Sequence, residues 1–124
     1  MKITCLSIAG FDPAGGAGVV ADILTFSRLK VWGTAAVAVV TAQNNARVHR
    51  VAPVSTGVLR KQIESVLEDF PPAAVKIGAL GSRANLREVS RLIREAGLKK
   101  VVVDPVLRAR DGSRLMEKGG VADY

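Results

Sequence analysis

Apolar runs alternate with amphipathic segments along this chain. The run from Ile3 to Ala9 precedes a segment, Gly16 to Lys30, in which Val, Ile, Leu and Phe recur at helical spacing. A short apolar run is typical of a buried strand, and a period of 3.6 residues is typical of a helix with one buried side. The pattern predicts parallel strands at residues 3–9, 34–41, 74–80 and 100–104.

Helices are predicted between these strands, over residues 16–30, 56–70 and 85–96. Ser55 or Thr56 caps the second helix, a proline pair stops it, and Gly97 closes the third. A short edge strand is expected at residues 50–54, where Pro53 interrupts pairing. This alternation predicts an α/β fold, a mostly parallel sheet between two helical layers, in one domain over residues 1–124.

Composition limits the class of protein. The chain has 124 residues, of which 48% are hydrophobic, 23% charged and 4% aromatic, which fits a folded α/β domain. The sequence shows neither a signal segment nor a membrane-spanning run, so we expect a cytoplasmic protein without a membrane partner. The single cysteine, Cys5, excludes an internal disulfide and is interpreted as a buried thiol.

The formal net charge of +7 has an ordinary explanation. Arginines recur at helical spacing opposite an apolar stripe, which indicates the solvated face of an amphipathic helix. These arginines are Arg83, Arg87, Arg91 and Arg94. We do not expect a nucleic-acid partner, because the chain lacks stacking aromatics and any recognisable binding module. Phosphorylated metabolites or an acidic partner surface would fit the charge as well.

Small and polar residues follow each predicted parallel strand. Ligands bind at the carboxyl ends of strands in open α/β sheets, so these segments predict one shared site. The segments are Gly10–Gly18, Thr41–Asn44, Gly78–Gly81 and Asp104–Val106.

The glycine-rich segment does not fit the common nucleotide motifs. A dinucleotide fingerprint needs a carboxylate at the end of the second strand, which here ends in Thr41-Ala42-Gln43. A phosphate-binding P-loop needs a Gly-Lys-Ser/Thr sequence after the glycines, and that sequence is also missing.

The chain instead resembles the hydroxymethylpyrimidine/phosphomethylpyrimidine kinases of thiamine biosynthesis, which have a ribokinase-like fold. The resemblance covers roughly residues 1–116 and corresponds to the N-terminal half of that fold. It is carried by the motifs Gly10-x-Asp12-Pro13-x-Gly15-Gly16-Ala17-Gly18-x-x-Ala21-Asp22, Thr25-Phe26-Ser27-x-Leu29, Thr41-Ala42-Gln43-Asn44, Val75-Lys76-Ile77-Gly78, Val102-Val103-Asp104-Pro105-Val106 and Asp111-Gly112-Ser113-Arg114-Leu115.

The resemblance implies transfer of a phosphoryl group from ATP, with Mg²⁺, to hydroxymethylpyrimidine and then to its monophosphate. Asp22 and the Gln43 amide could pair with the ring atoms of an aminopyrimidine, while alanine and valine side chains enclose its flat ring. The substrate-binding residues implied are Gly10, Ala17, Asp22, Thr41, Gln43, Ala79 and Val106.

Several of these residues have a simpler alternative. Asp22 could be a solvated helical carboxylate, and Gln43 could satisfy loop backbone. Asp104 is a candidate for the Mg²⁺ and phosphate region, or an Asp-Pro turn. Lys76 could meet phosphate, but we favour a strand lysine that reaches solvent.

The chain departs from the family pattern at three positions. Phe11 stands where the family usually has a small hydroxyl residue, and Ala14 where it has serine, so the glycine loop loses hydrogen-bonding capacity. Ala79 replaces a larger apolar residue, often methionine, and leaves room beside the ring.

Family members are about twice this long, and their second half carries the nucleotide site, anion hole and catalytic base. We therefore expect a truncated domain that does not transfer phosphate alone, whether it is a fragment, a split product or a short homologue. Its exposed flank predicts self-association or a complementary chain. Two alternatives remain: a pyridoxine or pyridoxal kinase-like protein, and a non-catalytic module that binds a pyrimidine.

Overall fold

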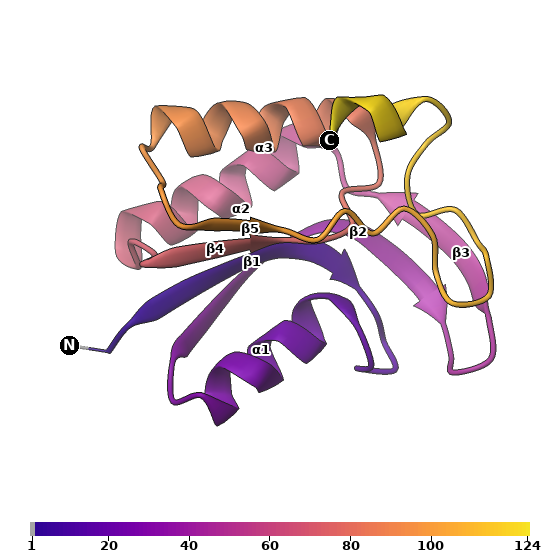
Figure 1. Cartoon of the computed structure of the whole chain (residues 1–124), viewed down its shortest axis with the longest axis horizontal. Helices are drawn as coiled ribbons and strands as arrows, with labels where there is room; N and C mark the ends of the chain where they lie inside the picture. The colour runs from indigo at the N-terminus through magenta and orange to yellow at the C-terminus, as the bar shows by residue number, and fades with distance from the viewer. Residues whose placement is uncertain (1) are drawn as a thin grey trace.

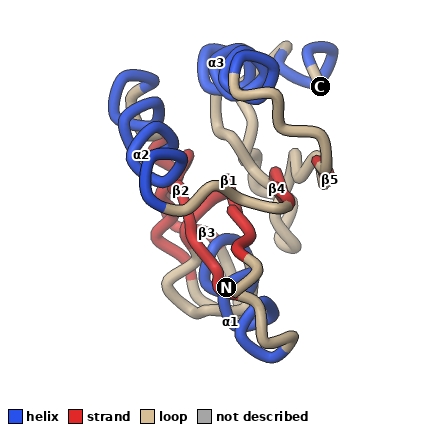
Figure 2. Tube along the Cα trace, turned by 90° about the vertical axis from the view of Figure 1, so that its left-hand side faces the viewer, coloured by secondary structure: helices blue, strands red, loops and turns tan. Residues whose placement is uncertain are grey.

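The fold is a three-layer α/β/α arrangement, seen in a computed structural model that describes residues 2–124. Helix α1 covers one face of the sheet, and α2 and α3 cover the other (Figures 1 and 2). The elements are β1 (Thr4–Phe11), α1 (Gly18–Arg28), β2 (Trp32–Gln43), β3 (Val48–Pro53), α2 (Thr56–Asp69), β4 (Ala74–Ile77), α3 (Arg83–Glu95), β5 (Val101–Val103) and the short 3-10 helix η1 (Gly120–Asp123).

The predicted parallel sheet is confirmed. Its strand order is β3-β2-β1-β4-β5, and every neighbouring pair is parallel except β2 with β3. The edge strand β3 ends at Pro53, opposite Val39, as expected for a residue without a backbone N–H. The carboxyl ends of β1, β2 and β4 therefore lie at the same edge of the sheet.

Strand β4 is shorter than the predicted run of residues 74–80. The Gly78 amide still donates to the Ile8 carbonyl, at 2.9 Å, but the chain then leaves the sheet. The carbonyl of Leu80 accepts from the Asn85 side-chain nitrogen instead, at 3.2 Å. A local hydrogen bond from the first turn of α3 thus replaces the sheet pairing that the apolar sequence predicted.

Asn85 joins three segments beneath α3. Its side chain is fully buried, and its amide nitrogen lies 3.2 Å from the Ala38 carbonyl and 3.0 Å from that of Val54. Its oxygen accepts from the Thr56 hydroxyl at 2.9 Å. Because each buried polar group finds a partner, this asparagine fixes how β2, α2 and α3 meet.

The main core lies between the sheet and the helices α2 and α3. Alternate residues of β1 and β4 face this layer, and the helices add one apolar stripe each. Its largest fully buried side chains include Leu6, Ile8, Leu59, Ile63, Leu80 and Val89.

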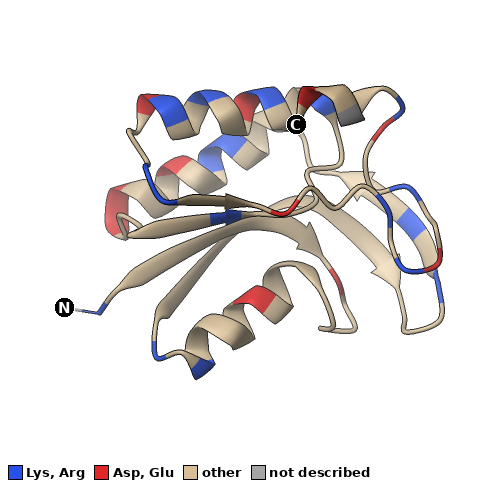
Figure 3. Cartoon of the chain, in the orientation of Figure 1, with Lys and Arg blue, Asp and Glu red and all other residues tan. Residues whose placement is uncertain are grey.

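The predicted solvated arginine face of α3 is partly engaged in ion pairs. Arg91 contacts Glu88 and Glu95, Arg83 contacts Asp123, and the exposed Arg87 lies 4.0 Å from the same Asp123 carboxylate. Acidic residues are interspersed among the arginines along the helix (Figure 3). Much of the positive charge of α3 is therefore neutralised within the molecule.

Helix α1 packs closely on β2 because of Gly33. A Cβ atom at Gly33 would lie 2.8 Å from the Ile23 side chain and 2.9 Å from that of Phe26, so both would have to shift to admit a larger residue. Cys5, in the adjacent strand, is only partly buried, contrary to the prediction.

Among the described residues, no helix combines the length and apolar character needed to cross a membrane.

Candidate functional site

A cavity of about 290 Å³ opens at the carboxyl ends of β1, β2 and β4. This volume is at the small end of the range for ligand sites and suits one small ring compound. Its lining includes all of the predicted substrate-binding residues and Asp104, together with Ala9, Phe11, Asp12, Gly16, Gly18, Ala21, Val39, Lys76, Gly78 and Leu115.

The glycine-rich loop forms one wall of the cavity and is organised by Asp12. The Asp12 carboxylate, 7% exposed, accepts hydrogen bonds from the amides of Ala14, at 2.8 Å, and Gly16, at 3.1 Å. Local side-chain to backbone bonding of this kind is what favours aspartate in turns. Asp12 therefore shapes the loop, a role that the glycine pattern alone did not reveal.

Gly18 allows the loop to fold back onto the end of β1. Its φ is +63°, and a Cβ atom there would lie 2.1 Å from the Gly10 carbonyl oxygen. Only glycine combines this backbone conformation with so close an approach. Helix α1 therefore starts directly beside the cavity.

Thr41 anchors the loop from the neighbouring strand. Its hydroxyl donates to the Phe11 carbonyl at 2.8 Å, and the residue is 6% exposed. The hydroxyl proton is engaged in this bond, so toward a ligand Thr41 offers only an acceptor.

Asp22 reaches the cavity from α1 and is held by two other elements. Lys76 of β4 donates to both carboxylate oxygens, at 3.0 and 2.9 Å, and the Ser7 hydroxyl of β1 donates to one of them at 2.6 Å. The prediction that Lys76 reaches solvent was wrong, because its ammonium turns toward α1. Asp22 is likewise an ion-paired side chain and not a freely solvated one.

The remaining predicted residues give the cavity an apolar wall and a polar edge. Ala17, Ala79 and Val106 provide the apolar contacts, and the small Ala79 side chain is 8% exposed. Gln43, at the end of β2, supplies an amide with donor and acceptor atoms. Phe11 also lines the cavity and is 36% exposed, so it stands at the entrance.

The segment after β5 is fastened to β3 by Asp111. The Asp111 carboxylate accepts from the amides of Val48, at 2.7 Å, and Ser113, at 2.9 Å. These hydrogen bonds hold the pKa of Asp111 below its usual range, and the one from the Val48 amide has the largest effect. The segment thereby keeps Val106 and Leu115 against the cavity.

Asp104 lies at the cavity rim and is exposed. Its amide donates to the Ile77 carbonyl and its carbonyl accepts from Val106, each at 2.8 Å, as in a turn. In residues 2–124, no cluster of three or more metal-ligating side chains forms. Asp104 stays a candidate for the Mg²⁺ and phosphate region, because proteins commonly hold Mg²⁺ through one or two carboxylates together with substrate phosphates.

The sequence did not predict that Ser7 contributes to the site, and the prediction for Lys76 was wrong. The two residues are directly opposite in the parallel pairing of β1 with β4, so both point to the α1 side of the sheet. A polar residue within each apolar run was the available signal. It became informative only once the register between the strands was known.

Comparison with known proteins assigns the family. The sequence profile described as Phosphomethylpyrimidine kinase matches residues 12–124. The chain belongs to this family. The predicted resemblance is therefore confirmed.

Curated relatives in the family are named hydroxymethylpyrimidine/phosphomethylpyrimidine kinase. The protein of Bacillus subtilis is 48% identical over 117 residues, which are 94% of this chain and 43% of the relative. That of Aquifex aeolicus is 37% identical, over 94% of this chain and 46% of the relative. The chain thus spans a little under half the length of these relatives.

Solved structures of the family and its neighbours have the same fold. The crystal structure of phosphomethylpyrimidine kinase from Clostridium difficile is 38% identical, with a TM-score of 0.90, over 98% of this chain and 53% of that one. A pyridoxal kinase from Staphylococcus aureus, in complex with AMP-PCP and pyridoxal, is 30% identical with a TM-score of 0.75, over 84% of this chain and 39% of that one. The ribokinase-like fold expected from the sequence is confirmed.

Proposed function

We propose that this chain is the pyrimidine-binding part of a hydroxymethylpyrimidine/phosphomethylpyrimidine kinase. The observation that carries the proposal is the convergence of Gly10, Asp22 and Gln43 on one small cavity at the carboxyl ends of three strands. Membership of the family supports the same substrate class.

The cavity offers complementary chemistry to an aminopyrimidine. The Gln43 amide and the Asp22 carboxylate can pair with donor and acceptor atoms on the ring edge. Ala17 and Ala79 give flat apolar contacts to the ring faces, and Gly10 leaves space where a Cβ atom would meet Val39 at 3.0 Å. Buried hydrogen bonds then provide selectivity, and the apolar walls provide contact area.

Calorimetric titration with hydroxymethylpyrimidine tests this proposal. Gln43→Ala is expected to weaken binding by about 1–3 kcal/mol, the cost of a lost hydrogen bond in a desolvated site. Asn45→Ala, an exposed loop substitution two residues away, is the matched control and should leave affinity unchanged. Equal affinity of wild type and Gln43→Ala would remove Gln43 from the site.

We also propose that the 124-residue chain alone does not turn over ATP. Phosphoryl transfer needs donors and a metal that neutralise the charge of the migrating group. Among the residues described here, no cluster of three or more metal-ligating side chains forms, and the glycine loop has no P-loop lysine. In the family, ATP with Mg²⁺ supplies the phosphoryl group. Steady formation of hydroxymethylpyrimidine phosphate by the purified chain would contradict this proposal.

A pyridoxal kinase-like activity is the second candidate. The similarity to the Staphylococcus aureus pyridoxal kinase solved with pyridoxal favours it. Parallel titrations with hydroxymethylpyrimidine and pyridoxal separate the two candidates by their relative affinity. A complementary C-terminal half is then added and kinase activity is measured. If the chain binds either compound but no kinase activity is restored, a non-catalytic binding module is favoured.

We further propose that copies of this chain self-associate through β5, unless a complementary chain covers it. Strand β5 is the last strand of the sheet, and its Val102 and Val103 are 64% and 50% exposed. An unpaired apolar edge favours pairing with another chain.

We also propose a cytoplasmic location, because a kinase needs ATP and the single cysteine suits a reducing compartment.

A further inference from the structure

The Lys76–Asp22 ion pair is part of the cavity wall and is largely withdrawn from solvent. The two side chains are 27% and 16% exposed, and Ser7, their third partner, is fully buried. The three residues come from β4, α1 and β1, so the network ties together the elements that form the cavity.

Partial burial of the Lys76 ammonium costs desolvation free energy, and its position depends on the residues around it. Its strand neighbours Val75 and Ile77 belong to the apolar core on the other face of the sheet. A Cβ atom at Gly78 would lie 2.9 Å from the Ala9 Cβ atom and 3.4 Å from the Lys76 ammonium nitrogen, so Gly78 permits the close approach of Ala9 beside the ion pair. Partly burying a charge is unfavourable unless it is paired and hydrogen-bonded, as it is here.

The hydrogen bonds to Asp22 leave one acceptor position open. A carboxylate has about four acceptor sites, two on each oxygen. Among the residues that the structure describes, Oδ2 accepts from both Ser7 and Lys76, whereas Oδ1 accepts from Lys76 alone. Asp22 lines the cavity, so a ligand can reach the side chain that carries this open acceptor position.

We propose that Lys76, with Ser7, is a positioning residue that fixes the Asp22 carboxylate so that Oδ1 accepts a hydrogen bond from the amino group of the ligand. This inference rests on the proposed function, and it deepens it by assigning the selection for an amino-substituted heterocycle to a three-residue network. Lys76 itself donates to Asp22 and need not contact the ligand.

Two ligands and a double-mutant cycle test the proposal. Hydroxymethylpyrimidine and its analogue without the amino group are titrated into wild type, Lys76→Met, Asp22→Asn and the double variant by calorimetry. Each single substitution is expected to weaken binding of the amino compound by about tenfold, and the double variant should bind it no more weakly than Asp22→Asn. Affinity for the analogue without the amino group should change little in all variants.

Lys61→Met is the matched control. It removes a lysine from the exposed Lys61–Glu64 pair on α2, away from the cavity, and should bind both compounds like wild type. Ser7→Ala repeats the comparison if Lys76→Met does not give a cooperative thermal melt, and should weaken binding of the amino compound selectively.

The outcomes separate this inference from the proposed function. An equal loss of affinity for both compounds, additive effects in the double variant, or wild-type affinity in Lys76→Met and Ser7→Ala would each overturn the positioning role while pyrimidine binding stands. Failure of the wild-type chain to bind either compound would overturn the proposed function, and the positioning role with it.

Discussion

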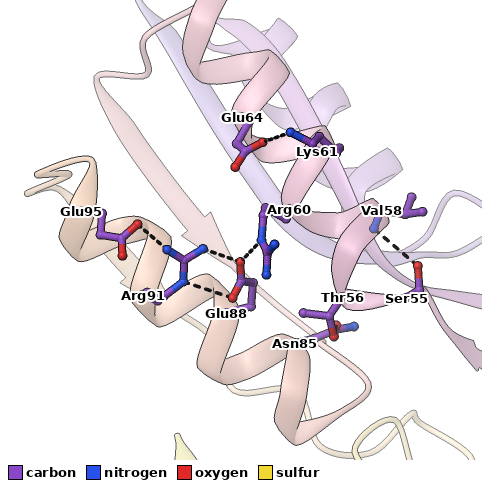
Figure 4. Close-up of polar contacts among 10 residues, drawn as sticks. All are labelled: Ser55, Thr56, Val58, Arg60, Lys61, Glu64, Asn85, Glu88, Arg91 and Glu95. Atoms are coloured by element: carbon purple, nitrogen blue, oxygen red, sulfur yellow. Dashed lines mark hydrogen bonds and ion pairs between the residues drawn. The ribbon is translucent and has the colours of Figure 1, made fainter.

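At the residue scale, Glu88 shows how one buried carboxylate joins two helices. It accepts from Arg91 of α3, at 2.6 and 3.2 Å, and from Arg60 of α2 (Figure 4). These hydrogen bonds, led by that from Arg91, lower the pKa of Glu88 from 4.5 to about 2. The charged form is therefore favoured in the folded chain over the unfolded one.

Glu88 should make stability depend on pH in the acid range. Because its folded pKa is depressed, its contribution is complete above about pH 4.5 and is lost as the pH falls toward 2. Glu88→Gln should remove about 1 kcal/mol of this dependence, allowing for solvent around the arginines. Urea unfolding across this pH range measures it. Glu64→Gln, at a partly exposed position of α2, is the control. A curve for Glu88→Gln parallel to wild type would contradict the interpretation.

The sequence predicted single residues where the chemistry is local. Gly10 and Gln43 could be assigned to one site because they lie at strand ends, and the family resemblance implied Asp22 as well. The cavity is lined by all three. Lys76 and Asn85 could not be interpreted in this way. Their partners are 54 and 47 residues distant in sequence, at Asp22 and Ala38, so only strand register and helix docking reveal their roles.

At the element scale, the turn from β1 into α1 depends on glycine at one position. Gly18 has a positive φ, and a Cβ atom added to it would lie 2.1 Å from the Gly10 carbonyl oxygen. A Cβ atom added to Gly57 in α2 would meet no atom within 4 Å. The glycines predicted the position of this turn, although they did not reveal the role of Asp12. The sequence predicted β4 too long, because its apolar residues do not show that the Leu80 carbonyl pairs with the Asn85 side chain and not with a strand.

The two glycines should respond oppositely to alanine. Gly18→Ala is expected to destabilise the fold by at least about 2 kcal/mol and to abolish ligand binding, because the loop must move off Gly10. Gly57→Ala should stabilise the chain by about 0.5 kcal/mol through helix propensity. Denaturant unfolding and calorimetry measure both effects. A Gly18→Ala variant with wild-type stability would disprove the close packing of this turn.

At the scale of the whole molecule, the sheet is covered unevenly. Helix α1 lies over one part of its face, and strand β5 forms an edge (Figure 2). The valines Val102 and Val103 of this edge strand are exposed. The alternation of apolar and amphipathic segments predicted the layers and the parallel strands. It could not predict the strand order, because that order depends on which segments pair across the chain.

Self-association through β5 should be sensitive to charge at Val102. Val102→Lys is expected to raise the dissociation constant of the self-associated form by about tenfold, because like charges would face each other across the paired edges. Sedimentation velocity over a range of concentrations measures this shift. Val58→Lys, on the exposed side of α2, is the matched control. A monomer at every concentration, or no response to Val102→Lys, would exclude this edge as the interface.

The most direct test of the account is a crystal structure of the chain soaked with hydroxymethylpyrimidine. Electron density for the ring is expected in the cavity, between Gly10 and Ala79, with the amino group facing Asp22 and the ring edge facing Gln43. The second large hollow, near Trp32 and Phe70 at the opposite end of the sheet, should remain without ligand. Density only at that hollow, or an unaltered cavity at saturating ligand, would contradict the account.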